Sequence, residues 1–258
     1  MNRTVVITGS TSGIGHAFAN LFANLGDDLI LVSRNNEALR AQCATLGHSH
    51  PHGRFSYIAA DLSDRTQVDM VCRRLAGKPI DILVNNAGFG MTGPFTQEDP
   101  QDILSMIDVN VAAPTALSRS VAEAMADRGH GRILNVASIA AFMPNPFGAV
   151  YAATKAYVLS LSEALSEELR GTGVTVSALC PGPTRSNFAK RSQMGRTRVF
   201  ATNVMDAESV ARAGYSGMMR GRRRIVPGIP NRILTGLSII VPTLIVLRVA
   251  AWALRYTD

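Results

Sequence analysis

Three residues that together could perform acid–base chemistry stand out in this chain: Ser138, Tyr151 and Lys155. Residues four apart lie one turn apart on the same face of a helix, so the Tyr151 phenol and the Lys155 ammonium would share one site. A phenol has a pKa near 10, and acting near neutral pH requires a drop of about 3 units, or roughly 4 kcal/mol. One unit charge at about 4 Å, in an effective dielectric of about 20, supplies on the order of that free energy. The chain has only three lysines, and one of them falls at this spacing. Tyr157, six residues after Tyr151, faces the opposite side of the predicted helix and is assigned to packing.

The elements that would position these residues alternate between short β-rich runs and longer helical stretches. The predicted strands are Val5–Thr8, Leu29–Ser33, Phe55–Ala60, Ile82–Asn85, Arg132–Ala137 and Val174–Cys180, with a last strand within residues 222–226. The predicted helices are Ile14–Leu25, Glu37–Leu46, Arg65–Leu75, Gln101–Met125 and Tyr151–Leu169. This alternation predicts an α/β fold with a doubly wound parallel sheet of the Rossmann type, which binds ligands beyond the carboxyl ends of its strands. We expect one dinucleotide-binding and catalytic domain over residues 1–226, followed by an apolar C-terminal helical extension over residues 227–258.

A glycine-rich loop, Thr8–Gly15, follows the first predicted strand and opens the first helix. Glycines at such a junction permit a tight turn, a close approach of the backbone to a pyrophosphate, and close packing of helix on strand. The phosphates would then meet the free N–H groups at the helix start. The residues expected to bind the dinucleotide here are Gly9, Ser10, Thr11, Ser12, Gly13, Ile14 and Gly15.

With its other motifs, the chain resembles the short-chain dehydrogenase/reductase family over roughly residues 1–226. The resemblance rests on the T-G-x-x-x-G-I-G loop, Asn85-Asn86-Ala87-Gly88, Asn110, Ser138 with Tyr151 and Lys155, and Pro181-Gly182. It implies that Asn110 kinks its helix and holds a water in a proton relay, and that Ser138 hydrogen-bonds the substrate oxygen. It also implies that Tyr151 is the acid or base, and that Lys155 binds the ribose and lowers the Tyr151 pKa. Further cofactor contacts implied by the resemblance are Asp61 and Leu62 at the adenine end, Asn86, Ala87 and Gly88 in the groove, and Pro181, Gly182 and Thr184 beside the nicotinamide.

The end of the second predicted strand favours NADP(H) over NAD(H). An acidic side chain at this place would accept from a ribose hydroxyl and repel a 2′-phosphate. This chain instead has Ser33 and Arg34, and no acid until Glu37. A guanidinium pairs with a phosphate through its planar fork, and the Ser33 hydroxyl can donate as well.

The charge of the chain is uneven along its length. Between Arg185 and Arg248 there are twelve Lys or Arg and two acids, although the whole chain carries a net charge of +7. This stretch is either a solvated arginine surface or a face for anions such as headgroups or phosphate-bearing substrates. No aromatic interleaving or nucleic-acid motif accompanies it, so we do not expect a nucleic-acid partner. The segment from residue 184 to 204 combines several of these cations with aromatic residues and is expected to cover the substrate site.

The cysteines and histidines bear on location and metals. Three widely spaced cysteines without a C-x-x-C pair suggest a reducing, cytoplasmic compartment, and no signal peptide is expected. The five histidines show no ligand spacing, so we expect no metal site.

The C-terminal extension is apolar but interrupted. Residues 233–247 carry no charge, and Pro242 divides them. A spanning helix needs about 20 apolar residues. Three interpretations stay open: two short helices on a membrane surface, a dimer contact or substrate lid, and a transmembrane anchor.

These features predict an oxidoreductase that transfers a hydride between NADP(H) and the carbonyl or alcohol carbon of an apolar substrate, such as a 3-oxoacyl or steroid-like ketone. The alternative is a non-catalytic NADP(H) sensor or scaffold at a membrane surface. The resemblance also implies a homodimer or homotetramer formed through the helices around residues 101–125 and 151–169.

Overall fold

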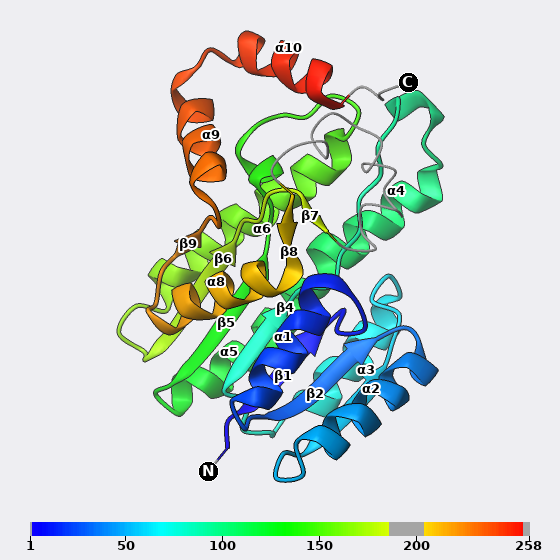
Figure 1. Cartoon of the computed structure of the whole chain (residues 1–258), viewed down its shortest axis with the longest axis vertical. Coiled ribbons are helices and arrows are strands. Elements are labelled where there is room, and N and C mark those ends of the chain that lie inside the picture. Colours follow the sequence, from blue (N-terminus) through cyan, green and yellow to red (C-terminus); the bar gives the residue numbers. More distant parts are fainter. Residues whose placement is uncertain (1, 186–203, 255–258) are drawn as a thin grey trace.

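The computed structural model of the chain describes residues 2–185 and 204–254. Its centre is a seven-stranded parallel sheet in the order β3-β2-β1-β4-β5-β6-β9, which confirms the predicted fold class (Figure 1). The chain proceeds outward from β1 to one side and then returns to β4 on the other, and open α/β sheets bind ligands in the crevice at such a reversal. The strands are β1 (Thr4–Thr8), β2 (Asp28–Ser33), β3 (Phe55–Ala59), β4 (Ile82–Asn85), β5 (Gly131–Val136), β6 (Val174–Leu179) and β9 (Arg224–Ile225).

Helices cover both faces of the sheet because its strands are apolar on both sides. Along β1, Val5 and Ile7 point into one core and Val6 into the other, as the period of two in a strand requires. The first core is completed by α1 (Gly13–Asn24), α2 (Asn36–Ser49) and α8 (Ala207–Met219). The second core is completed by α3 (Arg65–Leu75) and α5 (Ala113–Asp127). The long α6 (Ala149–Glu168) packs along β5 and β6.

The helix expected over residues 101–125 is not continuous. α4 (Pro100–Ile107) and α5 are joined by η2 (Asp108–Ala112), a turn of π-helix. Such wide turns are rare and are frequently found at functional sites. Asn110 lies at the centre of η2, so the regular α-helical pattern is interrupted at the residue for which the resemblance implied a kink.

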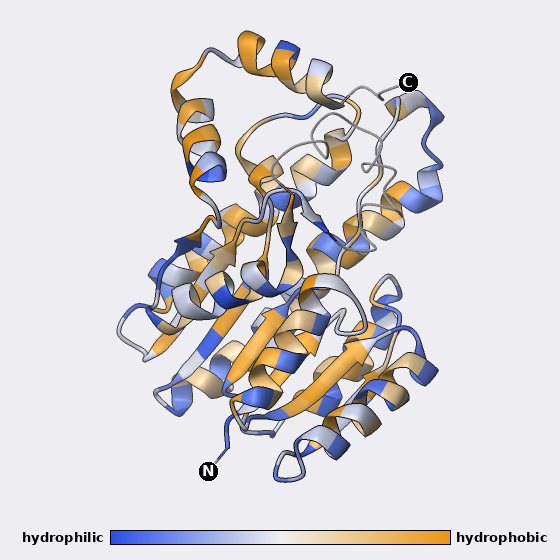
Figure 2. Ribbon diagram, viewed as in Figure 1, coloured by the Kyte–Doolittle hydropathy of each residue, from blue (hydrophilic) through white to orange (hydrophobic). Residues whose placement is uncertain are grey.

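Two short helices follow the last strand of the sheet. α9 (Ile229–Ile240) and α10 (Thr243–Leu254) have 12 residues each and are separated by Val241 and Pro242. In Figure 1 they form an arm above the carboxyl ends of the strands, and Figure 2 shows that this arm is largely hydrophobic. Within residues 2–185 and 204–254, no helix combines the length and the hydrophobicity that crossing a membrane requires.

Candidate active site

A cavity of about 1490 Å³ lies at the carboxyl ends of the strands and brings most of the predicted site residues together. The three residues proposed for catalysis, Ser138, Tyr151 and Lys155, share this cavity with the predicted cofactor contacts. Those that line it are Gly9, Thr11, Ser12, Gly13, Ile14, Ser33, Arg34, Asp61, Leu62, Asn86, Ala87, Gly88, Pro181, Gly182 and Thr184. Three others, Ser10, Gly15 and Asn110, are buried behind the cavity wall.

The glycine loop depends on two features that only glycine permits, a left-handed backbone conformation at Gly9 and a close backbone approach at Gly15. Gly9 has a φ of +65°, in the left-handed region. A Cβ on Gly15 would lie 2.2 Å from the carbonyl oxygen of Gly9. The Asn86 side chain then fixes the turn, because its Nδ2 donates to the carbonyl oxygens of Thr8 and Gly9 at 2.9 and 3.2 Å. The carbonyl of Ser10 accepts from Gln42 Nε2 at 2.9 Å, so α2 anchors the back of the loop.

Substitution of Gly15 by alanine tests this geometry. We expect Gly15→Ala to lose about 1–3 kcal/mol of folding free energy, because the new methyl group overlaps backbone that cannot move aside cheaply. Gly47→Ala is the matched control, since Gly47 lies within α2 and a Cβ there meets nothing within 4 Å. Thermal unfolding of both variants would check the prediction, and equal melting temperatures would contradict it.

The end of the cavity beside β2 gathers hydroxyls and one cation. The hydroxyls of Thr11 and Ser33 lie 3.1 Å apart and share a hydrogen bond. Arg34 Nη1 lies 3.9 Å from Asp61 Oδ2, and the Arg34 side chain is largely exposed. An ion pair of this length between exposed groups is weak, so the guanidinium can exchange it for a phosphate. The other Asp61 oxygen accepts from the backbone N–H and the hydroxyl of Ser63, which fixes the carboxylate at the cavity wall.

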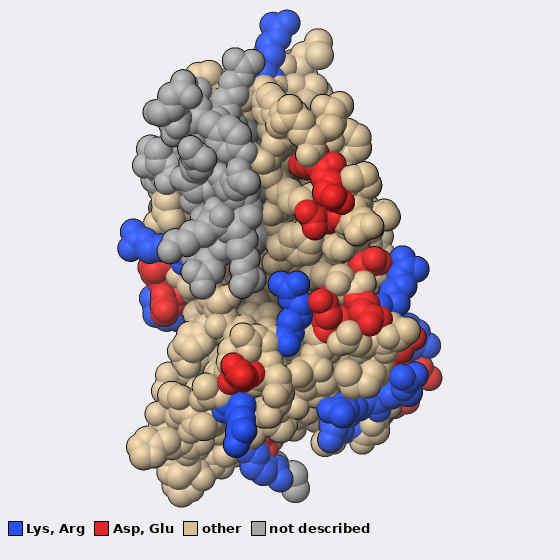
Figure 3. All heavy atoms as spheres, turned by 90° about the vertical axis from the view of Figure 1, so that its right-hand side faces the viewer, with Lys and Arg blue, Asp and Glu red and all other residues tan. Residues whose placement is uncertain are grey.

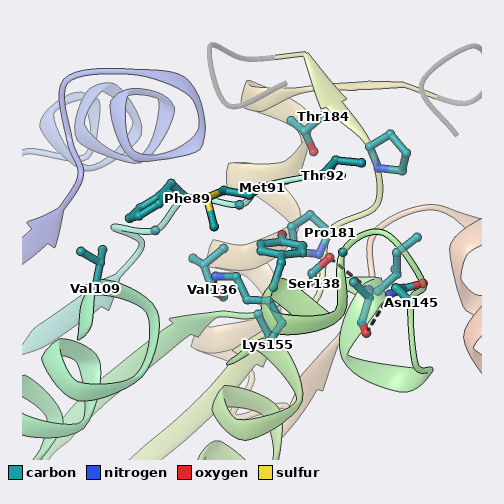
Figure 4. A pocket seen from close by; sticks show the side chains of 18 of the residues that line it. Phe89, Met91, Thr92, Val109, Val136, Ser138, Asn145, Lys155, Pro181 and Thr184 are labelled. Carbon is teal, nitrogen blue, oxygen red and sulfur yellow. Dashed lines mark hydrogen bonds between the residues drawn. The ribbon is translucent and has the colours of Figure 1, made fainter. Parts of the chain in front are cut away.

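The catalytic candidates converge from β5, the turn after it, and α6. The Lys155 ammonium donates to the carbonyl oxygen of Val136 at 2.9 Å and lies 5.9 Å from the centre of the Tyr151 ring. Ser138 Oγ accepts from the N–H of Ala140 at 3.1 Å, and the same hydroxyl hydrogen-bonds Tyr151. Figure 4 shows Ser138 and Lys155 on one side of the cavity, facing the segment that carries Phe89, Met91 and Thr92.

Burial governs the protonation of this pair. It raises the pKa of Tyr151 to about 12, and a hydrogen bond with Ser138 opposes this only in part. Burial also lowers the pKa of Lys155 to about 8. In the chain without a cofactor, Lys155 therefore does not lower the pKa of Tyr151 as expected. Desolvation disfavours both the Tyr151 phenolate and the Lys155 ammonium. Tyr151 keeps its proton at neutral pH, which suits a proton donor.

Sequence reasoning missed the support beneath Tyr151. Asn110 Nδ2 donates to Thr154 Oγ1 at 3.0 Å, and the Thr154 hydroxyl donates to the carbonyl oxygen of Tyr151 at 2.7 Å. The Asn110 amide also holds Phe89, accepting from its N–H and donating to its carbonyl at 3.1 and 2.9 Å. A Cβ on Gly88 would lie 2.9 Å from Asn110 Oδ1 and 3.3 Å from Lys155 Nζ. Asn110 therefore links the segment after β4, which contains Phe89, to the helix α6, which carries Tyr151.

The wall opposite the cofactor loop is apolar and comes from the C-terminal helices. The residues of the arm and of the break between its helices that line the cavity are Leu234, Leu237, Ser238, Val241, Ile245, Val246, Val249, Ala250 and Ala253. The arm approaches the turn that follows Ser138, since Ser238 Oγ, which donates to the carbonyl oxygen of Thr235 at 2.9 Å, lies 3.5 Å from the carbonyl oxygen of Phe142. The sequence showed that residues 233–247 are apolar, but it did not show that they lie over the site.

Acidic residues lie at another edge of the cavity. Glu98, Asp99 and Asp102 belong to its lining, and burial raises the pKa of Glu98. Figure 3 shows acidic side chains gathered on the face that carries α4. Of the segment 184–204 that was expected to cover the site, residues 186–203 lie outside the described residues.

The arginines of the C-terminal third are in part paired with acids. Arg223 lies 2.6 Å from Glu167, and Arg224 lies 2.5 Å from Glu163. Arg224 also lies over the ring of Phe142, 5.0 Å from its centre. For these residues the structure favours a paired, solvated surface over a face for anions.

Comparison with known proteins identifies the family of the chain. The family model for short chain dehydrogenases matches residues 3–197. A ketoacyl reductase of Nostoc sp. is 33% identical over 183 residues, which cover 70% of this chain but only 63% of that relative, less than two thirds of its length. A solved short-chain dehydrogenase from Sphingobium yanoikuyae in complex with NADPH is 32% identical, with a TM-score of 0.83 and coverage of 93% and 96% of the two chains. A short chain dehydrogenase/reductase from Burkholderia phymatum in complex with NAD is 27% identical, with a TM-score of 0.82 and coverage of 92% of each chain. The parallel sheet and the glycine loop are consistent with this match, which covers most of the chain. The protein therefore belongs to the short-chain dehydrogenase/reductase family of oxidoreductases.

Proposed function

We propose that the protein is an NADP(H)-dependent ketoreductase that acts on an apolar carbonyl substrate, such as a 3-oxoacyl chain or a steroid-like ketone. The observation that carries the proposal is the composition of the cavity. Ser138, Tyr151 and Lys155 lie in it beside the cofactor loop, and the helices α9 and α10 close its other side with aliphatic side chains. The similarity to a ketoacyl reductase supports the same substrate class.

Each residue has a role that its surroundings permit. The cofactor, when bound, supplies the hydride that the carbonyl carbon receives. Tyr151 donates its phenolic proton to the carbonyl oxygen, so that C=O becomes CH–OH and a phenolate is left to be reprotonated. Ser138 donates a hydrogen bond to the same oxygen, because its lone pair is engaged by the N–H of Ala140. Lys155, held by the Val136 carbonyl, binds the ribose hydroxyls.

The choice of NADP(H) rests on Arg34, Ser33 and Thr11. Their guanidinium and hydroxyl groups line the end of the cavity where a 2′-phosphate would lie. Similar proteins have been solved with NADPH and with NAD, so family membership alone does not decide the cofactor. Asp61, the nearest acid, is already held by Ser63 and faces Arg34.

NADPH consumption by the purified protein tests the proposed activity. The panel would contain 3-oxoacyl thioesters, steroid ketones and small aldehydes. Turnover of an apolar ketone would support the reductase. Tight NADPH binding without turnover of any of them would favour the non-catalytic sensor or scaffold instead.

The lowered pKa of Lys155 predicts how NADPH binding depends on pH. Because that pKa lies at about 8 rather than 10.5, the ammonium loses its proton as the pH rises through 8, whereas Tyr151 stays protonated to about 12. Losing a charged hydrogen bond to the ribose should weaken NADPH binding about tenfold between pH 7 and pH 9. Fluorescence titration of NADPH at several pH values would measure this. Lys155→Met should show weak binding at every pH, and a wild-type affinity that does not change would contradict the assignment.

We also propose an assembly and a location for the protein. A homodimer or homotetramer would use α4, α5 and α6, where Tyr157 is exposed and shares a hydrogen bond of 3.1 Å with Thr115. Cys43, Cys72 and Cys180 are free thiols, which suits a reducing, cytoplasmic compartment. The extension over residues 227–258 would act as a wall of the substrate site and as a contact for the membrane surface.

A further inference from the structure

The exposed large hydrophobic side chains of this protein are concentrated on one arm. Of thirteen such residues in the part of the chain that the structure describes, nine belong to α9 and α10. Scattered apolar residues are normal on a surface, whereas a contiguous apolar patch marks a binding surface. The nine residues, which we call the arm surface, are Ile229, Ile233, Leu234, Leu237, Ile240, Leu244, Ile245, Val249 and Trp252.

The arm surface is continuous with the substrate cavity. Leu237 on α9 and Ile245 on α10 are each about half exposed, and both also line the cavity. Val241, in the break between the two helices, lines the cavity as well. An apolar path therefore leads from the outer surface of the arm, past this break, to the chamber that holds Tyr151.

Charge and length narrow the choice of partner. Residues 227–254 contain Arg232 and Arg248 and no acid, so the arm surface is apolar and positive. A two-fold contact with a second copy would place this surface against itself and bring like charges together. Anionic headgroups over an apolar layer match it instead. Twelve residues make a helix of about 18 Å, shorter than the roughly 30 Å hydrocarbon layer, so each helix can lie along the surface of a bilayer.

We propose that the arm surface docks on an anionic phospholipid bilayer, and that a lipophilic ketone enters the cavity from the bilayer through the break between α9 and α10. The docking is inferred from the exposed apolar side chains and the positive charge of the arm. The entry route rests on the proposed reductase function.

Binding to vesicles tests the docking without any assay of activity. The full chain would be sedimented with phosphatidylcholine vesicles that contain or lack phosphatidylserine. We expect binding to the vesicles with phosphatidylserine, and a loss of at least tenfold for the double variant Ile240→Ser/Leu244→Ser. These side chains are 82% and 72% exposed and do not line the cavity. Leu25→Ser/Leu104→Ser is the matched control, because Leu25, directly after α1, and Leu104, on α4, are 49% and 60% exposed and should not contribute to binding.

A second readout separates docking from chemistry. Ile240→Ser/Leu244→Ser should keep wild-type NADPH affinity and wild-type turnover of a water-soluble ketone, but lose turnover of a long-chain ketone presented in vesicles. Wild-type chain that fails to bind vesicles would overturn the docking, and so would a double variant that binds as well as wild type. A double variant that instead converts a dimer to a monomer in light scattering would assign the arm surface to a second copy. Vesicle binding without turnover of any ketone would leave the docking in place and overturn the reductase and the entry route.

Discussion

Tyr151→Phe should lower the turnover of an apolar ketone by on the order of 10³-fold while NADPH binds as tightly as to the wild type. The substitution removes one oxygen and its proton from the buried centre of the cavity and keeps the ring in place. Without that proton, only the hydrogen bond from Ser138 stabilises the negative charge that develops on the carbonyl oxygen. Single-turnover measurements with saturating NADPH would report the chemical step alone.

Tyr157→Phe is the matched control for this experiment. Tyr157 lies on the same helix, six residues further along, but its hydroxyl bonds to Thr115 outside the cavity. Its loss should leave turnover unchanged within about twofold, since an exposed hydrogen bond contributes little. If both variants reduced the ketone at the wild-type rate, Tyr151 would not be the proton donor. If neither variant nor the wild type turned over any ketone, the result would support the non-catalytic NADP(H) sensor instead of the reductase.

The sheet and the cofactor loop were predictable because their signals are local. A strand such as β1 alternates its faces residue by residue, and the glycine loop that follows it needs a backbone conformation that few residues adopt. The order of the strands is a property of the tertiary structure, because the same alternation of strands and helices is compatible with more than one order. The same signals predicted one helix over residues 101–125. They overlooked Pro114, which has no N–H to donate to the carbonyl of Asn110 four residues before it, at the place where the π-turn lies.

The rest of the site depends on contacts between distant segments. Thr154 supports Tyr151 only because η2 brings Asn110 across to α6. Asn231 on α9 packs against Gly182, where a Cβ would lie 2.6 Å from its side chain, and this places the arm beside the segment proposed to flank the nicotinamide. Composition showed that the C-terminal stretch was apolar. Only tertiary structure shows which of its side chains line the cavity and which, such as Ile240 and Leu244, are exposed away from it.

Arg34→Asp should reverse the choice of cofactor, weakening NADPH about 100-fold and leaving NADH unchanged or improved. Arg34 faces the end of the cavity beside Ser33, and its guanidinium is restrained only by a 3.9 Å contact with Asp61. The variant loses a charge-assisted hydrogen bond of about 1.5–3 kcal/mol to the 2′-phosphate, and it sets a carboxylate against that dianion. With NADH the same carboxylate can accept from the ribose hydroxyl. Dissociation constants for both nucleotides would give the specificity ratio directly.

Arg40→Asp provides the matched control for the charge change. Arg40 is exposed on α2, six residues beyond Arg34, and does not line the cavity. Its substitution alters the net charge equally and should shift NADPH affinity by less than about twofold at physiological salt, because Arg40 makes no contact in the cavity and the field of an exposed charge is screened by salt. An equal loss of NADPH affinity in both variants would mean that the overall positive charge of the protein, rather than a specific phosphate site, governs the affinity. If Arg34→Asp retained its preference for NADPH, the 2′-phosphate would have to be held by Thr11 and Ser33 without the arginine, and a further Ser33→Asp substitution would then have to produce the reversal.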